Sequence, residues 1–410
     1  MSKLRMKKIL QINTVGNCGS TGRIAEQIGI AAQNAGFESF IACGRRIRPS
    51  RSQIIKIGSE WHTYPNVAWT RIFDSDSPLA KISTLKFIEK IREISPDIIH
   101  LHNLHGYYLH VPTLLKFLGE YNRPTVWTLH DCWPITGHCC YYDFIQCEKW
   151  KTICGNCPQK KEYPTSLVFD RSRKNHEEKI GLISKIQNLT FVAVSQWLAS
   201  VVKQSRVGDK NIVVIRNGID LNTFYPMQNS EQDPSHKRKK GLFVASDWTK
   251  RKGFFLIPEI AKNLENIDCT VVGVTEKQRE FLRQYGIKAI TKTESTAELR
   301  DLYSNADVFI NPTLEEALSM VNIEATACGT AVVTFDSGGT SETVGDGTGI
   351  VVERGDISAL CRAAEKIARK KSPQTIEKCV SYAQENFSAQ NSFQKYVDLY
   401  KNTINRAPSE

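Results

Sequence analysis

Two blocks of alternating strand-like and helix-like segments, separated by a polar stretch, constrain the fold of this chain more than any other feature. Short apolar runs typical of buried strands alternate with longer segments whose apolar residues recur at helical spacing. This alternation predicts parallel sheets built from βαβ units. The polar stretch, residues 227–240, predicts a linker. Because 410 residues also exceed one ordinary domain of about 100–200 residues, two α/β domains are expected.

The expected elements follow the same division. In the first block, a strand at 8–14 leads through a glycine-punctuated loop, 16–22, into a helix at 21–35. Further strands are expected at 38–43, 97–101, 125–129, 191–194 and 212–215, and in the second block at 241–245, 269–272, 308–310 and 331–335. The predicted domains cover residues 1–226 and 241–388, and an amphipathic helix opens the C-terminal segment, 389–410.

The segment from Val308 to Gly329 has the clearest chemical meaning. A strand ends at Ile310, and a helix begins near Ser319, a residue type that often caps helix N-termini. The backbone N–H groups of the first helical turn, residues 320–322, have no partner within the helix. Such N–H groups favour a bound anion, so this turn is a predicted diphosphate site.

Two glutamates flank this predicted phosphate site. Glu324 lies about one turn into the helix, where its carboxylate can accept hydrogen bonds from both hydroxyls of a ribose. Glu316 lies on the preceding loop, from which it can reach hydroxyls of a group attached beyond the phosphates. Two isolated glutamates would more simply be solvated surface residues. Their position around a helix N-terminus instead favours a site for a nucleotide sugar.

Several strings around these glutamates match a known pattern. Glu316 and Glu324 form an E-x7-E pair, which continues as EATACGTAVV and is followed by GGTSE at 338–342. The pattern resembles the signature of the retaining glycosyltransferases of family 4, which have the GT-B fold. Similar strings follow in the family's order along nearly the whole chain: PDIIHLH at 96–102, TLHD at 128–131, NGID at 217–220 and RKG at 251–253. Within the family the chain looks most similar to bacterial enzymes of O-antigen, capsule and colanic-acid synthesis.

The resemblance implies a fold and a function. The implied fold is α/β of the GT-B type, with two Rossmann-like domains facing across a cleft and a C-terminal helix crossing back to the N-terminal domain. The implied function is retaining transfer of a hexose-type sugar from a nucleoside-diphosphate donor, a UDP- or GDP-sugar, to a growing, lipid-linked surface polysaccharide. A lysine and a helix N-terminus would stabilise the leaving diphosphate, so no cofactor is expected for catalysis.

The resemblance also implies a role for each matching residue. Glu324 would hold the ribose hydroxyls and Glu316 a hydroxyl of the donor sugar. Lys252 would balance the charge of the diphosphate, and His130 would lie near the sugar. The implied catalytic residues are therefore His130, Lys252 and Glu316, and the implied donor-binding residues are Gly19, Arg251, Lys252, Ala317, Leu318, Ser319, Met320, Val321 and Glu324.

Two departures from the family pattern affect the implied phosphate site. The usual glycine-phenylalanine-glycine after the first glutamate is Ala317-Leu318-Ser319 in this chain. Ser246 stands where many members have an arginine, and Lys250 or Arg251 would have to replace it. A catalytically silent family member that still binds a nucleotide sugar is therefore an alternative.

Six of the twelve cysteines fall between Cys132 and Cys157, within a predicted insertion at 132–158. The pair Cys154 and Cys157 has the C-x2-C spacing common in zinc sites. The predicted set for a structural zinc ion is Cys139, Cys147, Cys154 and Cys157, with Cys140 or His138 as alternative ligands. A group of buried free thiols is the other interpretation.

Nearby aromatic and histidine residues allow two interpretations each. The aromatic residues can form a wall for an acceptor sugar or a small core; they are Trp133, Tyr141, Tyr142 and Trp150. Three histidines, His100, His102 and His105, follow one strand, and the first two share a face. We interpret them as a polar strand end without a metal. The string Asp74-Ser75-Asp76 lies in a polar stretch and is interpreted as a loop, not as a metal motif.

The net charge of +11 and the isoelectric point near 9.0 favour polyanionic partners. A basic, zinc-bearing nucleic-acid-binding protein is one alternative, but lysines and arginines are spread along the chain, so no nucleic acid is expected. A nicotinamide-dependent oxidoreductase is a weaker alternative, because the first glycine loop has the spacing G-x2-G-x2-G and not the G-x-G-x2-G of dinucleotide-binding loops.

The N-terminal stretch is too short and polar for a signal peptide, and no apolar run approaches the roughly 18 residues of a membrane span. We therefore expect a cytoplasmic protein. A predicted helix carries Lys81, Lys86, Lys90 and Arg92, which form either a contact with the anionic inner membrane or an ordinary solvated face.

Overall fold

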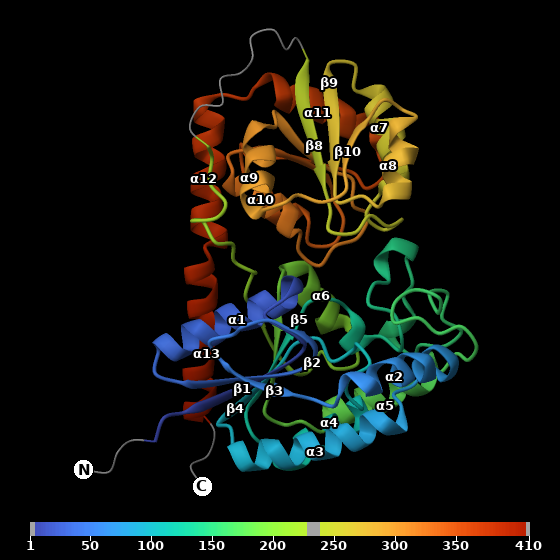
Figure 1. Ribbon diagram of the computed structural model, residues 1–410, viewed down its shortest axis with the longest axis vertical. Helices are drawn as coiled ribbons and strands as arrows, with labels where there is room; N and C mark the ends of the chain where they lie inside the picture. The colour runs from blue at the N-terminus through green and yellow to red at the C-terminus, as the bar shows by residue number, and fades with distance from the viewer. Residues whose placement is uncertain (1–4, 228–237, 407–410) are drawn as a thin grey trace. The chain divides into compact units, whose positions relative to one another are not determined.

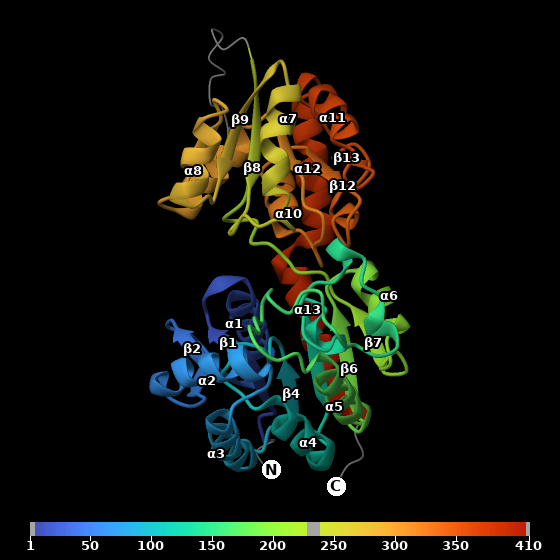
Figure 2. The same cartoon turned by 90° about the vertical axis from the view of Figure 1, so that its right-hand side faces the viewer.

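The computed structural model describes residues 5–227 and 238–406, which form two compact units. The first unit extends to Ile215 and takes up the chain again from Phe393, and the second unit covers Arg216–Ser392. Each unit has one parallel sheet with helices on both faces (Figures 1 and 2). No helix in the described part of the chain is both long and apolar enough to span a bilayer.

The first unit contains seven strands, which follow the sheet order β3-β2-β1-β4-β5-β6-β7. Its elements are β1 (Lys8–Gly16), α1 (Gly19–Asn34), β2 (Glu38–Ile47), β3 (Gln53–Lys56), α2 (Glu60–Phe73), α3 (Pro78–Ile94), β4 (Ile98–Leu101), α4 (Val111–Tyr121), β5 (Thr125–Leu129), α5 (Ser172–Ser184), β6 (Leu189–Ala193), α6 (Gln196–Gln204) and β7 (Asn211–Val214). The insertion after β5 has only short 3-10 turns: η1 (Trp133–Ile135), η2 (Asp143–Ile145) and η3 (Lys149–Lys151).

The second unit contains six strands in the order β10-β9-β8-β11-β12-β13. Its elements are β8 (Lys239–Val244), η4 (Phe254–Leu256), α7 (Ile257–Asn263), β9 (Ile267–Val272), α8 (Glu276–Arg283), β10 (Lys288–Ile290), α9 (Thr296–Asn305), β11 (Val308–Asn311), α10 (Met320–Ala327), β12 (Val332–Phe335), η5 (Ser341–Thr343), β13 (Gly349–Val352), α11 (Ile357–Arg369) and α12 (Pro373–Phe387). Both strand orders are the doubly wound arrangement of Rossmann-like domains.

The helix α13 (Ala389–Arg406) closes the first unit as the resemblance implied. From Phe393 onward it contributes an apolar stripe with Tyr396, Val397 and Tyr400, all buried. The hydroxyl of Tyr400 lies 2.5 Å from Nδ1 of His100, at the end of β4. The C-terminal helix is therefore part of the core of the first unit.

Three boundaries differ from the prediction. The first unit ends at Ile215 and not at residue 226, because Arg216 forms a 2.9 Å ion pair with Glu342 of the second unit. The predicted linker at 227–240 is shorter, since β8 begins at Lys239; residues 228–237 lie outside the described part of the chain. The helix α1 begins at Gly19, within the loop predicted at 16–22.

Candidate active site

The candidate donor-binding residues lie where two neighbouring strands of the second sheet end. The strands β8 and β11 are adjacent, although β9 and β10 separate them in the chain. Open α/β sheets bind ligands at such points of reversed strand order, beyond the carboxyl ends of the strands. The turn at 251–253 follows β8, and the loop with Glu316 follows β11. The topology thus brings two distant motifs of the sequence to one edge.

A tight turn places Arg251 and Lys252 against the loop that follows β11. Gly253 adopts a φ of +76°, and a Cβ there would lie 2.1 Å from the carbonyl oxygen of Pro312. Only glycine permits this approach. The N–H of Leu314 in turn donates to the carbonyl of Arg251 at 2.8 Å. The RKG string therefore fixes a contact between two loops.

Two basic side chains meet the carboxylate of Glu316. Lys252 Nζ forms a close ion pair with its Oε2, and Nη1 of Arg251 lies 3.7 Å from the same oxygen. Arg251 also donates from Nη1 to the carbonyl of Glu315 at 2.5 Å. Arg251 therefore supplies the guanidinium beside Lys252, since position 246, where many family members have an arginine, holds the exposed Ser246. Three residues of the predicted donor site are in direct contact.

The charge of Lys252 depends on its surroundings. Burial, followed by the positive charge of Arg251, lowers the pKa of Lys252 to about 7, and the carboxylate of Asp247 opposes the shift. A negatively charged ligand at this position would favour the ammonium form and raise the pKa again. The site therefore has a cation whose charge increases when an anion binds.

A glycine turn supports Glu316 from another side. The N–H of Gly339 donates to the carbonyl of Glu316 at 2.8 Å. Gly338 has a φ of +62°, and a Cβ there would lie 2.1 Å from the same carbonyl oxygen. The two glycines of the GGTSE string thus hold the backbone of Glu316, which explains their place in the motif.

A buried amide network anchors the start of α10. Asn311, at the end of β11, donates from Nδ2 to Oγ of Ser319 at 3.0 Å and to Oδ1 of Asn322 at 2.7 Å. Asn322 donates to Oγ1 of Thr343 at 2.9 Å. Ser319 occupies the predicted N-cap position, but its side chain makes no capping hydrogen bond. The predicted cap is wrong in this respect, because the hydroxyl of Ser319 accepts from Asn311 instead.

The remaining predicted donor contacts lie along α10 and before it. Ala317 and Leu318 are buried, whereas Met320 and Val321, in the first turn of α10, are half-buried. Glu324 is also half-buried, and its Oε2 accepts a 2.9 Å hydrogen bond from the hydroxyl of the buried Tyr303. This bond orients the carboxylate predicted to hold a ribose.

In the first unit, the polar residues predicted at the strand ends form a chain of hydrogen bonds. His102 lies between His130 and Gln11. Its Nδ1 is 3.1 Å from Nε2 of His130, and its Nε2 is 3.0 Å from Oε1 of Gln11. The rings of His100 and His102 lie on the same face, with centroids 4.1 Å apart, as predicted. Gly19, with a φ of +62°, is the first residue of α1, the helix that follows β1.

His100 and His130 are neutral at physiological pH. Burial lowers the pKa of His130 to about 4, against the opposing charge of Asp131, and lowers that of His100 to about 3. A neutral imidazole can donate or accept a hydrogen bond but carries no charge. The role implied for His130, close to the donor sugar, is thus compatible with hydrogen bonding; that role stays a prediction.

The cysteines of the insertion only partly match the predicted zinc set. All twelve cysteines lie in the described part of the chain, and none forms a disulfide. Cys139, Cys147, Cys154 and Cys157 line one small pocket. However, the described residues contain only one group of three potential ligands whose atoms lie within 4.8 Å of one another, and these four cysteines are not in it. The four-thiolate site stays a prediction.

The structure bears on two other interpretations. Tyr142 and Trp150 are buried with their ring centroids 4.8 Å apart, so these two belong to a small core. Trp133 and Tyr141 are half-buried, and an acceptor wall formed by them stays a prediction. Asp74 lies between α2 and α3 as the predicted loop requires, and its Oδ1 pairs with Nδ1 of His138 at 2.7 Å. A carboxylate on one ring nitrogen is typical of metal-ligating histidines, and His138 lines the same pocket as the four cysteines, so it stays an alternative ligand.

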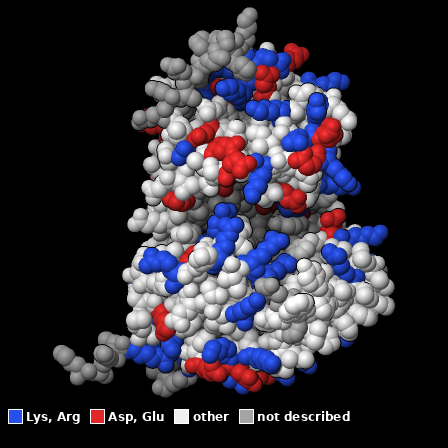
Figure 3. Space-filling view, viewed as in Figure 1, with Lys and Arg blue, Asp and Glu red and all other residues white. Residues whose placement is uncertain are grey.

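Comparisons with known families identify the class of protein. Residues 21–223 match the family described as Glycosyltransferase Family 4, and residues 238–370 match Glycosyl transferases group 1. The chain therefore belongs to the group 1 glycosyltransferases of family 4, as its motifs predicted. On the face drawn in Figure 3, basic side chains are separated by uncharged and acidic surface. Membership of this family favours a glycosyltransferase over the nucleic-acid and nicotinamide alternatives.

Among curated proteins, the chain is 25% identical over 366 residues to the putative colanic acid biosynthesis glycosyl transferase WcaC of Escherichia coli, covering 85% of this chain and 87% of that protein. It is 27% identical over 202 residues to the capsular polysaccharide biosynthesis glycosyltransferase CapM of Staphylococcus aureus, covering 44% and 53%. Both relatives are named for the synthesis of surface polysaccharides.

Solved structures share the fold. Sucrose-phosphate synthase from Thermosynechococcus elongatus superposes with a TM-score of 0.72 at 17% identity, over 98% of this chain and 100% of that one. HepE of Anabaena, in complex with UDP-glucose, gives a TM-score of 0.65 at 15% identity, over 96% and 99%. At these identities the likeness shows the GT-B fold and no more.

Sequence reasoning missed the residues that support the site. Asn311, Asn322, Thr343 and Tyr303 all hold predicted donor-binding groups in place. Asn311 had a usable signal, because a buried strand that ends in a polar residue often carries a site at its carboxyl end. Tyr303 had no such sequence signal, since its partner Glu324 lies on another helix, 21 positions away.

Proposed function

We propose that this chain transfers a hexose-type sugar, with retention of anomeric configuration, from a UDP- or GDP-sugar to a growing, lipid-linked surface polysaccharide. One observation carries the proposal: Lys252, Glu316 and the N-terminal turn of α10 meet at one edge of the second sheet, with Glu324 one turn further along. Retention and the lipid-linked acceptor rest on the family resemblance, and the polysaccharide on the names of the relatives.

The arrangement suits a departing nucleoside diphosphate. When the bond between sugar and phosphate breaks, negative charge grows on the phosphate oxygen. Lys252 and the N–H groups at the start of α10 would stabilise that charge, since both lie beyond the carboxyl ends of the neighbouring strands β8 and β11. Glu316 forms an ion pair with Lys252. A bound diphosphate would replace this carboxylate as the partner of the ammonium, and Glu316 would become available to a sugar hydroxyl.

Calorimetric titration of UDP and GDP into the full-length protein tests the donor site. We expect one of the two to bind, and Glu324→Ala to weaken it by about 1–3 kcal/mol, the cost of a lost buried hydrogen-bond partner. The exposed Glu353→Ala, in the same unit, is the matched control. If neither nucleotide binds at millimolar concentration, the proposed UDP- or GDP-sugar donor is wrong.

The stereochemistry needs a separate test. The proton NMR coupling of the anomeric position in the product, compared with that of the donor, distinguishes retention from inversion. An inverted product would remove the retaining assignment while leaving the nucleotide site intact.

We also propose a contact between α3 and an anionic inner membrane. The exposed face of α3 carries Leu79, Ile82 and Leu85, of which Ile82 is 52% exposed, next to Lys81 and Lys86. An apolar stripe flanked by lysines is typical of helices that lie in a membrane interface. Of the four predicted basic residues, Lys90 pairs with Glu93 and Arg92 lies over a phenylalanine ring, so these two contribute less.

Co-sedimentation with vesicles tests this contact. We expect binding to vesicles rich in phosphatidylglycerol but not to pure phosphatidylcholine, and a loss of binding in Ile82→Glu. The control Glu89→Gln changes an exposed residue of the same helix without removing apolar or basic character. Binding that is equal for both vesicle types, or unchanged in Ile82→Glu, would contradict the proposal.

A further inference from the structure

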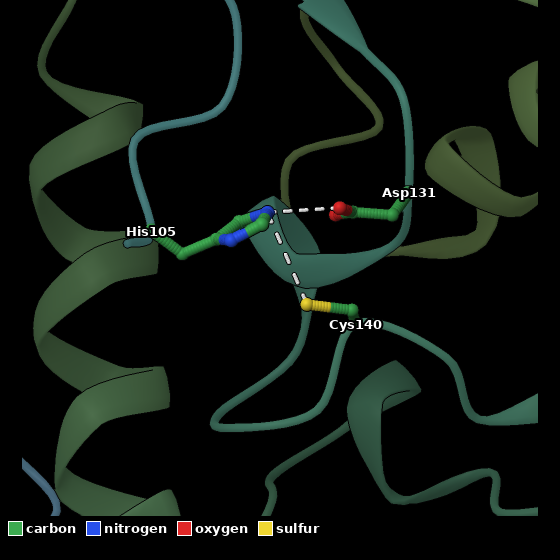
Figure 4. Close-up of side chains that lie close together, drawn as sticks. All are labelled: His105, Asp131 and Cys140. Carbon is green, nitrogen blue, oxygen red and sulfur yellow. Dashed lines mark hydrogen bonds and ion pairs between the residues drawn. The ribbon is translucent and has the colours of Figure 1, made fainter. Parts of the chain in front are cut away.

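Three side chains outside the donor site converge in the first unit. His105 follows β4, Asp131 follows β5, and Cys140 lies in the insertion (Figure 4). Nε2 of His105 lies 2.9 Å from Oδ2 of Asp131 and 3.9 Å from Sγ of Cys140. The three atoms all lie within 4.8 Å of one another, and no other three potential ligands among the described residues come so close.

Other atoms of the same residues are anchored and fix this orientation. Nδ1 of His105 lies 3.2 Å from the hydroxyl of Tyr163. Oδ1 of Asp131 accepts from the backbone N–H of Trp133 at 2.9 Å. The backbone carbonyl of Cys140 accepts from the backbone N–H of Cys132 at 2.9 Å. Outer contacts of this kind orient the first ligands of protein metal sites. Nε2, Oδ2 and Sγ are thereby turned toward one another.

The geometry differs from that of a nucleophilic cysteine. In such a site the histidine contacts the thiol through one ring nitrogen and a carboxylate through the other. Here Asp131 and Cys140 both approach Nε2 of His105. Three ligand atoms within 4.8 Å of one another, with both partners at the same ring nitrogen, suit a cation better than a proton relay.

We propose that His105, Asp131 and Cys140 bind a zinc ion. Imidazole, carboxylate and thiolate together suit Zn²⁺, whereas Mg²⁺ and Ca²⁺ prefer oxygen ligands alone. The carboxylate and the thiolate balance the two charges of the ion, and the thiol proton is released on binding. The remaining ring proton of His105 then lies on Nδ1, from which it donates to Tyr163.

Three protein ligands leave one position for water or another ligand. His105 also lines a cavity of about 270 Å³ together with Tyr107 and Trp133. The ion would tie the segments after β4 and β5 to the insertion. This site shares no ligand with the predicted set of Cys139, Cys147, Cys154 and Cys157, which makes the two separable by experiment.

The test uses the full-length chain with Cys147→Ser, which breaks the four-thiolate set and leaves the proposed ligands intact. Zinc content is measured after removal of metal and reloading with zinc, and X-ray absorption counts the neighbours of the ion. We expect one zinc per chain with a single sulfur neighbour near 2.3 Å and nitrogen or oxygen for the rest. Thermal melting follows folding, and zinc should raise the midpoint.

Two further substitutions in the same background complete the test. Asp131→Asn and Cys140→Ala should each lose the zinc and its effect on the melting midpoint, while Cys18→Ser, a cysteine near the start of α1, should keep both. The proposal is overturned if the Cys147→Ser protein binds no zinc, or if its zinc has three or more sulfur neighbours. The neighbour count needs no further variant, so misfolding of Asp131→Asn or Cys140→Ala does not remove the test.

Discussion

Replacement of Lys252 gives the sharpest prediction for the donor site. Lys252 pairs with Glu316, and burial and Arg251 lower the pKa of the lysine to about 7, so this pair keeps its full charge only below that pH. If Lys252 contacts the diphosphate, Lys252→Ala removes one charge-assisted hydrogen bond. Such a bond contributes about 1.5–3 kcal/mol, which corresponds to a Kd about 10- to 150-fold higher.

The lowered pKa adds a pH dependence with a defined sign. As the pH rises through 7, the free protein loses the proton of Lys252, whereas a bound diphosphate holds it. Affinity must therefore fall above pH 7, by up to about tenfold per pH unit, or about 1.4 kcal/mol. A terminal phosphate titrates near pH 6, so between pH 7 and 9 the charge of the nucleotide is nearly constant.

Calorimetry at pH 7, 8 and 9 measures this slope for four proteins. The wild type should lose affinity with rising pH, and Lys252→Ala should bind weakly with no slope. Lys252→Arg, which stays charged throughout, should also lose the slope while binding more tightly than Lys252→Ala. The adjacent, exposed Lys250→Ala should behave as the wild type. A wild-type Kd that is constant from pH 7 to 9, or a slope that survives in Lys252→Ala, refutes the reasoning.

Three more substitutions probe the groups that hold the site. Gly338→Ala should lower the thermal midpoint and the activity far more than Gly286→Ala. Both glycines have a positive φ, which costs alanine about 1–2 kcal/mol, but only at Gly338 would the Cβ meet a backbone oxygen, at 2.1 Å. Tyr303→Phe should weaken nucleotide binding by about 0.5–1.5 kcal/mol in calorimetry, and should have no further effect once Glu324 is alanine. Asn322→Ala should lower the free energy of unfolding of the second unit by about 2–3 kcal/mol in urea titrations, because Asn311 and Thr343 lose hydrogen-bond partners. The control Asn402→Ala, at an exposed position, should change the free energy of unfolding by no more than about 0.5 kcal/mol.

The sequence predicted the buried strands because they are continuous apolar runs. Central strands such as β5 and β12 are buried along their whole length, so their sequence pattern leaves little ambiguity. The edge strand β3, from Gln53 to Lys56, was absent from the expected set, since both of its end residues are exposed and it resembles a loop. The same holds for β10, whose three residues are partly or fully exposed.

The sequence located candidate site residues where a motif is local and missed the contacts that depend on folding. The RKG turn and the loop of Glu316 were each recognised from short strings, and the strand order brings them together. The contact between Tyr303 and Glu324 joins separate helices, so no spacing in the sequence reveals it. His105 was grouped with the histidines that precede it in the chain. The structure pairs it instead with Asp131 and Cys140, which come from other segments.

The departure at Ala317-Leu318-Ser319 bears directly on the silent-member alternative. Glycines would be needed there if the backbone required a positive φ, but none of these three residues has one. All three residues are at most 4% exposed, so they are packed within the protein. The groups predicted to contact phosphate are backbone N–H groups, which every residue except proline supplies. The substitution therefore changes packing beneath the site and leaves its hydrogen-bond donors in place, which argues for a working donor site.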